Sequence, residues 1–138
     1  MSEQNKTIAR KVFEDVQSQG NLAVVDEIVA SDFVGHTFPT DIHGPEGAKQ
    51  FDMMLRTAFP DIQVSVEDQI AEGDEVATRW TCRGTHKGEF QGLPPTGKKV
   101  TMRGITVFRI ANGKLVEGWN NPDLLGMLQQ LGAVPVPG

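Results

Sequence analysis

The sequence predicts an α+β fold in which helices come first and a curved antiparallel sheet follows. Three observations support this class. Apolar residues recur with helical spacing through residues 3–59, and they alternate with polar residues from position 61 onward. Two of the alternating segments are divided by Asn112-Gly113, which is a strong hairpin signal. Because helices separated along the chain from antiparallel strands are typical of α+β domains, we expect one domain covering residues 1–138.

Three helices are expected before the sheet. The first covers residues 3–19 and places its apolar side chains on one face. Asn21 can cap a second, shorter helix, and a third runs from Pro45 to the break at Pro60. Residues 33–38, between the second and third helices, form a short extended segment. These helices supply an inner layer on which the sheet can pack.

Four strands are expected from the alternation of apolar and polar residues, at positions 61–66, 75–83, 98–110 and 114–120. The stretch between the second and third strands is rich in Gly and Pro and is expected to be a bend and an irregular loop. A strongly bent sheet over the helices would leave one end open, with an apolar pocket that holds a few polar groups. The core is expected to include Val12, Phe13, Val16, Phe51, Leu55, Trp80, Val107 and Leu128.

The last strand leads into a short helix that carries the leading catalytic candidate. Asn121-Pro122 is expected to stop the strand and begin the helix, and Gly132 to end it. Asp123 lies in the first turn, at a corner between two rigid elements. If its carboxylate faces a dry pocket, desolvation raises its pKa and makes it a stronger base. The alternative is an Asp that stabilises the helix start and has no other function.

Composition excludes several classes of function. The net charge of −5 argues against a nucleic-acid partner and against an anionic membrane surface. No apolar run approaches the roughly 18 residues that span a bilayer. Cys82 is the one cysteine, so no internal disulfide forms, which fits a reducing cytoplasm. His, Cys and carboxylates show no metal-ligand spacing, and there is no phosphate-binding Gly-rich loop. We therefore expect a cytoplasmic protein without a metal site.

Two histidines are candidates for contact with a substrate. His36 lies among apolar neighbours in the extended segment, where it can hold a substrate carbonyl or orient Asp123. The alternative is a hydrogen-bonded structural histidine. His86 follows a Gly-Thr step in the bend after the second strand, and the alternative there is that it fixes the bend.

The hairpin supplies further candidates. A two-residue turn at Asn112-Gly113 places Arg109 opposite Val116 and on one face with Val107 and Asn120. An Arg on such a face can bind a substrate carboxylate or an enolate, and the alternative is an ion pair with Glu117. Trp80 and Trp119 are expected in the core or the cavity wall. The residues expected to contact substrate are Trp80, His86, Val107, Arg109, Trp119 and Asn120.

Motifs over nearly the whole chain resemble a known family. They are Gly84-Thr85-His86, Pro94-Pro95-Thr96-Gly97, Phe108-Arg109-Ile110, Gly113-Lys114, Glu117, Trp119, Asp123-Leu124-Leu125-Gly126 and Gln129-Gln130-Leu131-Gly132. With them the sequence resembles the SnoaL-like polyketide cyclases, a branch of the nuclear transport factor 2-like superfamily. The resemblance implies a cone-shaped sheet around the N-terminal helices, a deep internal cavity and a homodimer formed through the sheet.

The resemblance also implies a chemistry. Cyclases of this family close a ring by intramolecular aldol condensation of a carbonyl compound, without metal or cofactor, and an Asp near the end of the last strand is the general acid/base. That role is carried here to Asp123, with His36 in support. The chain departs from the family pattern just before it, since Gly118 and Asn120 stand where relatives often have His and Asp.

Three functions are therefore open from the sequence. The first is a cyclase-like enzyme that acts on a small apolar, polyketide-like carbonyl compound. The second is a non-catalytic ligand-binding or dimerisation module with the same fold. The third is another reaction on this scaffold, by an isomerase, dehydratase, epoxide hydrolase or hydroxylase.

Overall fold

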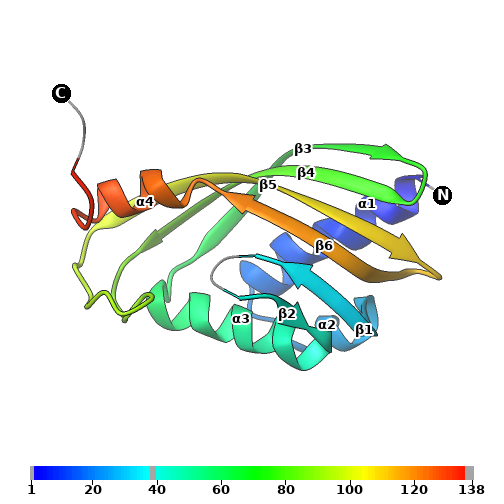
Figure 1. The fold of residues 1–138 in the computed structure, drawn as a ribbon, viewed down its shortest axis with the longest axis horizontal. Helices are drawn as coiled ribbons and strands as arrows, with labels where there is room; N and C mark the ends of the chain where they lie inside the picture. The colour runs from blue at the N-terminus through cyan, green and yellow to red at the C-terminus, as the bar shows by residue number, and fades with distance from the viewer. Residues whose placement is uncertain (1, 38–39, 136–138) are drawn as a thin grey trace.

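A curved sheet of six strands bends around the helices in the computed structural model, which describes residues 2–37 and 40–135 (Figure 1). The helices are α1 (Ser2–Lys11), η1 (Val12–Gln17), α2 (Ala23–Ile28), α3 (Gly44–Ala58) and α4 (Leu124–Gln130). The strands are β1 (Val29–His36), β2 (Ile42–His43), β3 (Gln63–Glu72), β4 (Glu75–Thr85), β5 (Lys99–Ala111) and β6 (Lys114–Pro122). The predicted α+β fold class is confirmed.

The sheet is mixed, which corrects the expectation of a purely antiparallel one. Its strand order is β2-β1-β6-β5-β4-β3, and β1 pairs with β6 in parallel while the other neighbours are antiparallel. The parallel pair joins strands that are far apart in the sequence, so no turn signal marks it. Residues 33–36 of the extended segment predicted at 33–38 form the end of β1, and residue 38 lies outside the described residues.

The N-terminal helices fill the concave side of the sheet. α1 continues directly into η1, a short π-helix, and the two pack against β3 and β4. Phe13 is the centre of this contact: its ring lies 6.3 Å from those of both Trp80 and Phe108. Of the eight predicted core residues, Phe13, Val16 and Trp80 are buried, the other five are partly buried, and none is exposed.

Helix α3 forms the opposite wall and packs against β1 and β2 (Figure 1). It begins at Gly44, with Pro45 in its first turn, and ends at Ala58 just before Pro60, as the two prolines predict. Its buried residues are Ala58 and, unexpectedly, Asp52.

The β5–β6 hairpin has the predicted turn but a different register. Asn112 and Gly113 have φ angles of 54° and 75°, as the two central positions of a type I′ turn require. A bulge follows: Ile110 pairs with Leu115, yet Arg109 pairs with Glu117. One extra residue on β6 moves every later side chain to the other face. The prediction that Arg109 lies opposite Val116 and shares a face with Asn120 is therefore wrong.

The end of β6 also differs from the prediction. The strand continues through Pro122, and Asp123 rather than Asn121 is the N-cap of α4. The side chain of Asp123 accepts a hydrogen bond from the backbone N–H of Gly126, the third helical residue. This is the usual way in which an Asp satisfies a donor that the helix start leaves free.

Candidate functional site

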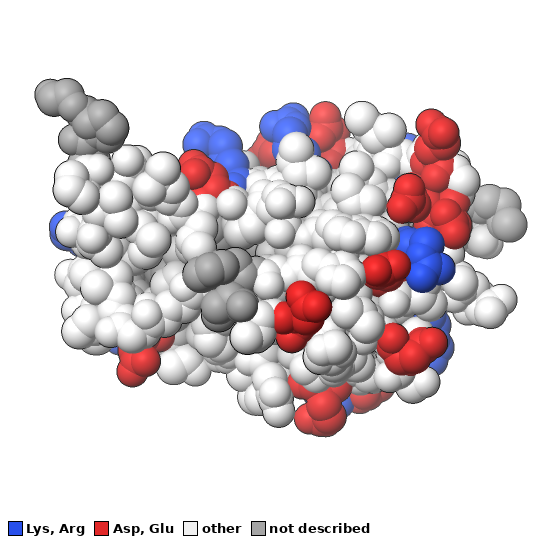
Figure 2. All heavy atoms as spheres, viewed as in Figure 1, with Lys and Arg blue, Asp and Glu red and all other residues white. Residues whose placement is uncertain are grey.

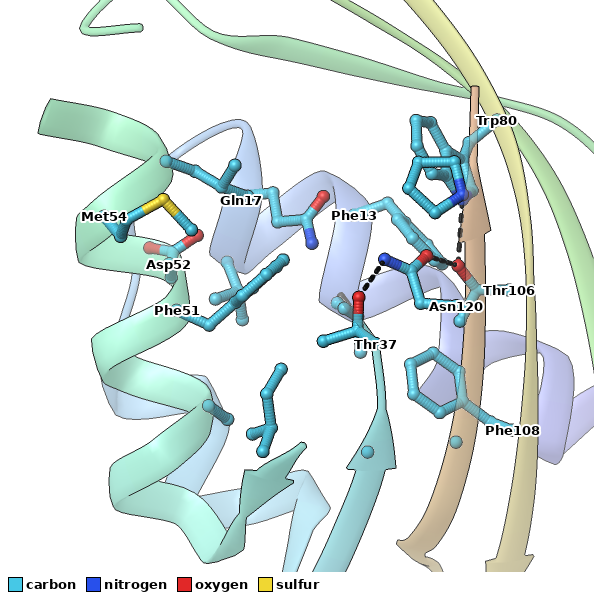
Figure 3. Close-up of a pocket in the computed structure, with 18 of the residues that line it drawn as sticks. Phe13, Gln17, Thr37, Phe51, Asp52, Met54, Trp80, Thr106, Phe108 and Asn120 are labelled. Atoms are coloured by element: carbon cyan, nitrogen blue, oxygen red, sulfur yellow. Dashed lines mark hydrogen bonds between the residues drawn. The ribbon is translucent and has the colours of Figure 1, made fainter. Parts of the chain in front are cut away.

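A cavity of about 140 Å³ lies between the concave face of the sheet and the helices. Its walls are mainly apolar, and Phe13 and Phe108 on one side face Phe51 and Met54 of α3 on the other (Figure 3). The polar side chains in the lining are Gln17, His36, Thr37, Asp52, Trp80, Cys82, Gln91, Thr106, Trp119 and Asn120. Such a site, apolar with a few polar groups, is typical for small organic ligands.

Four polar side chains form a directed hydrogen-bond chain on the sheet side of the cavity (Figure 3). The indole N–H of Trp80 donates to Thr106 Oγ1 at 2.9 Å, and the Thr106 hydroxyl donates to Asn120 Oδ1 at 2.8 Å. The Asn120 amide then donates to Thr37 Oγ1 at 3.2 Å. Because Trp can only donate, the direction of the whole chain is fixed. One N–H of Asn120 and the O–H of Thr37 are left over as donors.

Trp80 and Asn120 both line the cavity, and their contact with a substrate stays a prediction. Gly118 lies beside Asn120, and a Cβ there would lie 2.8 Å from the Phe108 ring. The aromatic ring therefore occupies the space that a side chain at position 118 would need.

Asp52 is a site residue that sequence reasoning missed. Its carboxylate projects from α3 into the cavity (Figure 3), the residue is 2% exposed, and neither oxygen has a hydrogen-bond partner among the described residues. Desolvation raises the pKa of Asp52 to about 6, with the Arg56 charge acting in the opposite direction. A signal was present, because position 52 is four residues after Ala48 and three before Leu55, inside the apolar stripe of the helix.

Arg56 does not neutralise Asp52 directly. Its guanidinium donates to the backbone oxygens of Gln17, at 2.7 Å, and Ser18, at 3.5 Å, so it is held at the C-terminal end of η1. Within the described part of the chain, no ion pair shorter than 4.0 Å involves Asp52.

Asp123 is not in the cavity lining, so the condition that its carboxylate faces a dry pocket is not met, and the side chain fits the alternative of an Asp at the helix start. The residue is exposed, its Oδ1 accepts the Gly126 N–H at 2.9 Å, and it borders a shallow depression together with Arg79 and Arg103. The physical reason is the cap itself, since a carboxylate that bonds the first turn of α4 cannot also turn inward. Its catalytic role stays an untested prediction.

His36 borders the cavity at the end of β1, but the partners of its ring nitrogens, Glu117 and Asp41, are not in the cavity lining. Nε2 donates to Glu117 Oε2 at 2.8 Å, Nδ1 lies 3.5 Å from Asp41 Oδ2, and the ring stacks 5.8 Å from that of Trp119. The hydrogen bond to Glu117 is the main cause that raises the pKa of His36, and Asp41 adds to it. His36 therefore contacts two carboxylates, and Asp123 is not among them.

The bulge in β6 places a second group of predicted residues on the convex face of the sheet. Arg109 Nη2 lies 3.4 Å from Glu117 Oε1, which matches the ion-pair alternative. Bonds from His36 and then Arg109 lower the pKa of Glu117. Val107, which pairs with Trp119, is not in the cavity lining, and neither is Arg109. Val107 and Arg109 thus lie outside the cavity lining, and their contact with a substrate stays a prediction, whereas Trp119 borders the cavity from the edge.

His86 is fully buried and lies outside the cavity lining. Its Nδ1 accepts the backbone N–H of Thr96 at 3.2 Å, and its ring lies 5.6 Å from that of Phe59. These contacts tie the loop after β4 to the core. His86 thus fits the alternative that it fixes the bend, and its contact with a substrate stays a prediction.

The described residues contain no group of three or more His, Cys, Asp or Glu arranged to hold a metal ion. None of the helices within 2–37 and 40–135 is long and apolar enough to cross a membrane. On the face shown in Figure 2, acidic side chains are most frequent at the right end and along the bottom, a few lie beside basic ones at the upper edge, and no continuous basic patch is visible.

Comparisons with known proteins agree with one another. A family model described as SnoaL-like polyketide cyclase matches residues 7–131. The nogalonic acid methyl ester cyclase of Streptomyces nogalater is 32% identical over 111 residues, which cover 78% of this chain and 83% of that enzyme. Two of the similar solved structures are a SnoaL-like polyketide cyclase candidate from Jannaschia sp. CCS1 and AclR, a hydroxylase candidate from Streptomyces galilaeus.

The structural likeness extends over the whole fold. The Jannaschia protein has a TM-score of 0.88 at 28% identity and covers 97% of this chain and 95% of its own. AclR has a TM-score of 0.86 at 27% identity, covering 100% of this chain and 87% of its own.

Proposed function

Because the chain belongs to the SnoaL-like polyketide cyclase family, we propose that this cyclase-like enzyme closes a ring within a small, polyketide-like carbonyl compound held in the cavity. The observation that carries the proposal is the apolar cavity with its directed chain of donors on one wall. The reaction proposed is an intramolecular aldol condensation, which needs a proton-transfer group and donors for the developing oxyanion. No metal and no cofactor take part in it.

The geometry assigns a distinct role to the donor chain. The free N–H of Asn120 and the O–H of Thr37 can hold a substrate carbonyl oxygen and stabilise the enolate or alkoxide that forms on it. Trp80 and Thr106 fix the orientation of the carboxamide, so these donors need little reorganisation during the reaction. The apolar walls exclude water, and this exclusion strengthens each such hydrogen bond.

The first test is turnover of nogalonic acid methyl ester, the compound in the name of the Streptomyces relative. Aldol closure leaves the molecular mass unchanged, so the product is followed by chromatographic separation and NMR. We expect Asn120→Ala to lower kcat by about 10²–10³-fold, the usual effect of losing an oxyanion donor. Asn121→Ala, at an exposed position on the same strand, is the matched control and should retain the rate. Equal rates for the two variants would remove Asn120 from the mechanism.

The similarity to AclR favours one alternative reaction, a hydroxylation. Mass spectrometry separates the two, because hydroxylation adds an oxygen atom to the product. The alternative of a non-catalytic binding module predicts that the ester quenches Trp80 fluorescence without being converted.

We also propose a homodimer formed through the convex face of the sheet, in the cytoplasm. A row of apolar residues crosses that face from β3 to β6, through the pairs of Ile70 with Ala77, Ala77 with Val107, and Val107 with Trp119. Ile105 lies beside this row and is 47% exposed. Contiguous apolar surface on a sheet commonly marks a contact with another chain. The buried free thiol of Cys82 is compatible with a reducing compartment.

A further inference from the structure

We propose that Asp52 on α3 is the group that removes and returns the proton during ring closure. The inference rests on the proposed function and assigns a residue to its central step. Asp52 is the one carboxylate among the described residues that line the cavity. On the sheet side of the cavity, the last strand contributes the carboxamide of Asn120. A carboxamide does not accept a proton near neutral pH.

The placement of Asp52 fits this step. It projects from α3 toward the open space, and Thr37 and Asn120 project toward the same space from the other side (Figure 3). A carbonyl compound between the walls can place its oxygen on the two donors and an adjacent C–H against the carboxylate. The base and the oxyanion donors then act on neighbouring atoms of one substrate, which is the arrangement that enolate formation requires.

A structural role for Asp52 is hard to reconcile with its surroundings. A buried carboxylate that stabilises a fold is normally hydrogen-bonded or paired, because an unpaired one costs stability. Both oxygens of Asp52 lack a partner in the described residues although the residue is only 2% exposed. Asp52 lines the cavity, so a ligand held there can supply the proton that the described residues do not.

The charges around Asp52 suit a base that works near neutral pH. Desolvation raises its pKa to about 6, so the group is mostly ionised at pH 7 yet more basic than an ordinary carboxylate. Arg56 on the same helix opposes this shift. From the other elements around the cavity, the titratable groups are His36 of β1, whose ring is bound to Glu117, and Cys82 of β4, whose thiol pKa burial raises to about 11.

The step balances within one substrate molecule. The Asp52 carboxylate takes a proton from the carbon next to a carbonyl, and the C–H electron pair forms the enolate. The enolate carbon bonds to a second carbonyl carbon, whose π electrons move to its oxygen. The protonated Asp52 returns the proton to that alkoxide. The product is an isomer of the substrate, so no oxidant or co-reactant is needed.

The test uses 5-nitrobenzisoxazole, a probe whose ring opens to a coloured phenolate when a base removes its C3 proton. We expect the wild-type protein to accelerate this reaction, with a rate that rises through about pH 6. Asp52→Asn should reduce the acceleration by about 10²–10⁴-fold and remove the pH dependence. Asp32→Asn, which changes an exposed carboxylate on β1, is the matched control and should retain both. Asp123→Asn tests the competing assignment, in which Asp123 is the general acid/base.

Each outcome is decisive. The inference is supported if Asp52→Asn loses the acceleration of ring opening and both Asp32→Asn and Asp123→Asn retain it. Loss in Asp123→Asn alone, equal activity of Asp52→Asn and wild type, or no acceleration by the wild type overturns it. Circular dichroism checks that the Asn variant is folded, and Asp52→Ala replaces it if it is not. If Asp52 passes this test but nogalonic acid methyl ester and related diketones are not cyclised, the proposed function fails while the base assignment stands.

Discussion

Asp52 shows how one residue can carry a cost in stability for the sake of a site. Its carboxyl group takes the place of an apolar side chain on the inner stripe of α3, and neither oxygen has a hydrogen-bond partner in the described part of the chain. Replacing it by an uncharged isostere removes a buried charge whose desolvation the nearby Arg56 charge offsets only in part. The residue that is proposed to give the cavity its reactivity is therefore also expected to weaken the fold.

The first prediction concerns stability against pH. The pKa of Asp52 is about 6 in the folded protein, against the ordinary value of 3.8. The folded state binds the Asp52 proton more tightly than the unfolded state does. The stabilisation of the fold by this proton is therefore complete below about pH 4 and is lost as pH rises through 6. The loss at pH 7 is at most about 3 kcal/mol. In urea unfolding, the free energy of unfolding of Asp52→Asn should therefore increase relative to that of the wild type between pH 4 and 7. A constant difference across this range would contradict the burial of the charge.

At the scale of elements, α4 depends on Asp123. The helix covers Leu124–Gln130, and the Asp123 carboxylate bonds the Gly126 N–H at its start. Asp123→Ala removes this cap and should lower the free energy of unfolding by about 1 kcal/mol. Asp123→Ser keeps a capping oxygen and should recover most of the loss. Urea titrations of the three proteins measure the effect, and equal midpoints for Ala and wild type would show that the cap contributes nothing.

Helix α3 and the β5–β6 hairpin show which features of the elements the sequence can and cannot predict. The helix boundaries at Pro45 and Pro60 and the turn at Asn112-Gly113 follow from local backbone chemistry, and the structure confirms them. The bulge in β6 has no comparable local signal, yet it determines which residues face the cavity. This single shift accounts for the misplacement of Arg109 relative to Asn120.

The position of a site residue can be predicted only where the sequence pattern around it and its packing in the fold point to the same face. Trp80 is expected in the core or the cavity wall, and the structure places it in both, buried and lining the cavity. Asp52 interrupts an apolar stripe, a signal that becomes decisive only when the missing hydrogen-bond partners are known. Asp123 was assigned through a resemblance, and the direction of its side chain depends on where β6 ends and α4 begins.

At the scale of the whole molecule, the two faces of the sheet have different surroundings. The concave face is covered by the helices and carries the cavity, whereas the convex face presents Ile105 and the apolar row of Ile70, Ala77, Val107 and Trp119. The cluster of His36, Glu117 and Arg109 borders that row. An apolar centre with a polar rim is the usual composition of a protein–protein contact.

The last prediction follows from this face. We expect the wild-type protein to sediment as a dimer at micromolar concentration, and Ile105→Glu to sediment as a monomer. Removing the new carboxylate from water in an apolar contact is costly, even beside Arg79, its cross-strand neighbour. Met53→Glu is the matched control: Met53 is also 47% exposed but lies on α3, on the other side of the cavity. It should remain a dimer. The proton-transfer activity of monomeric Ile105→Glu should be close to wild type, since each cavity is built within one chain. A wild-type monomer, or dissociation by Met53→Glu and not by Ile105→Glu, would refute the convex face as the interface.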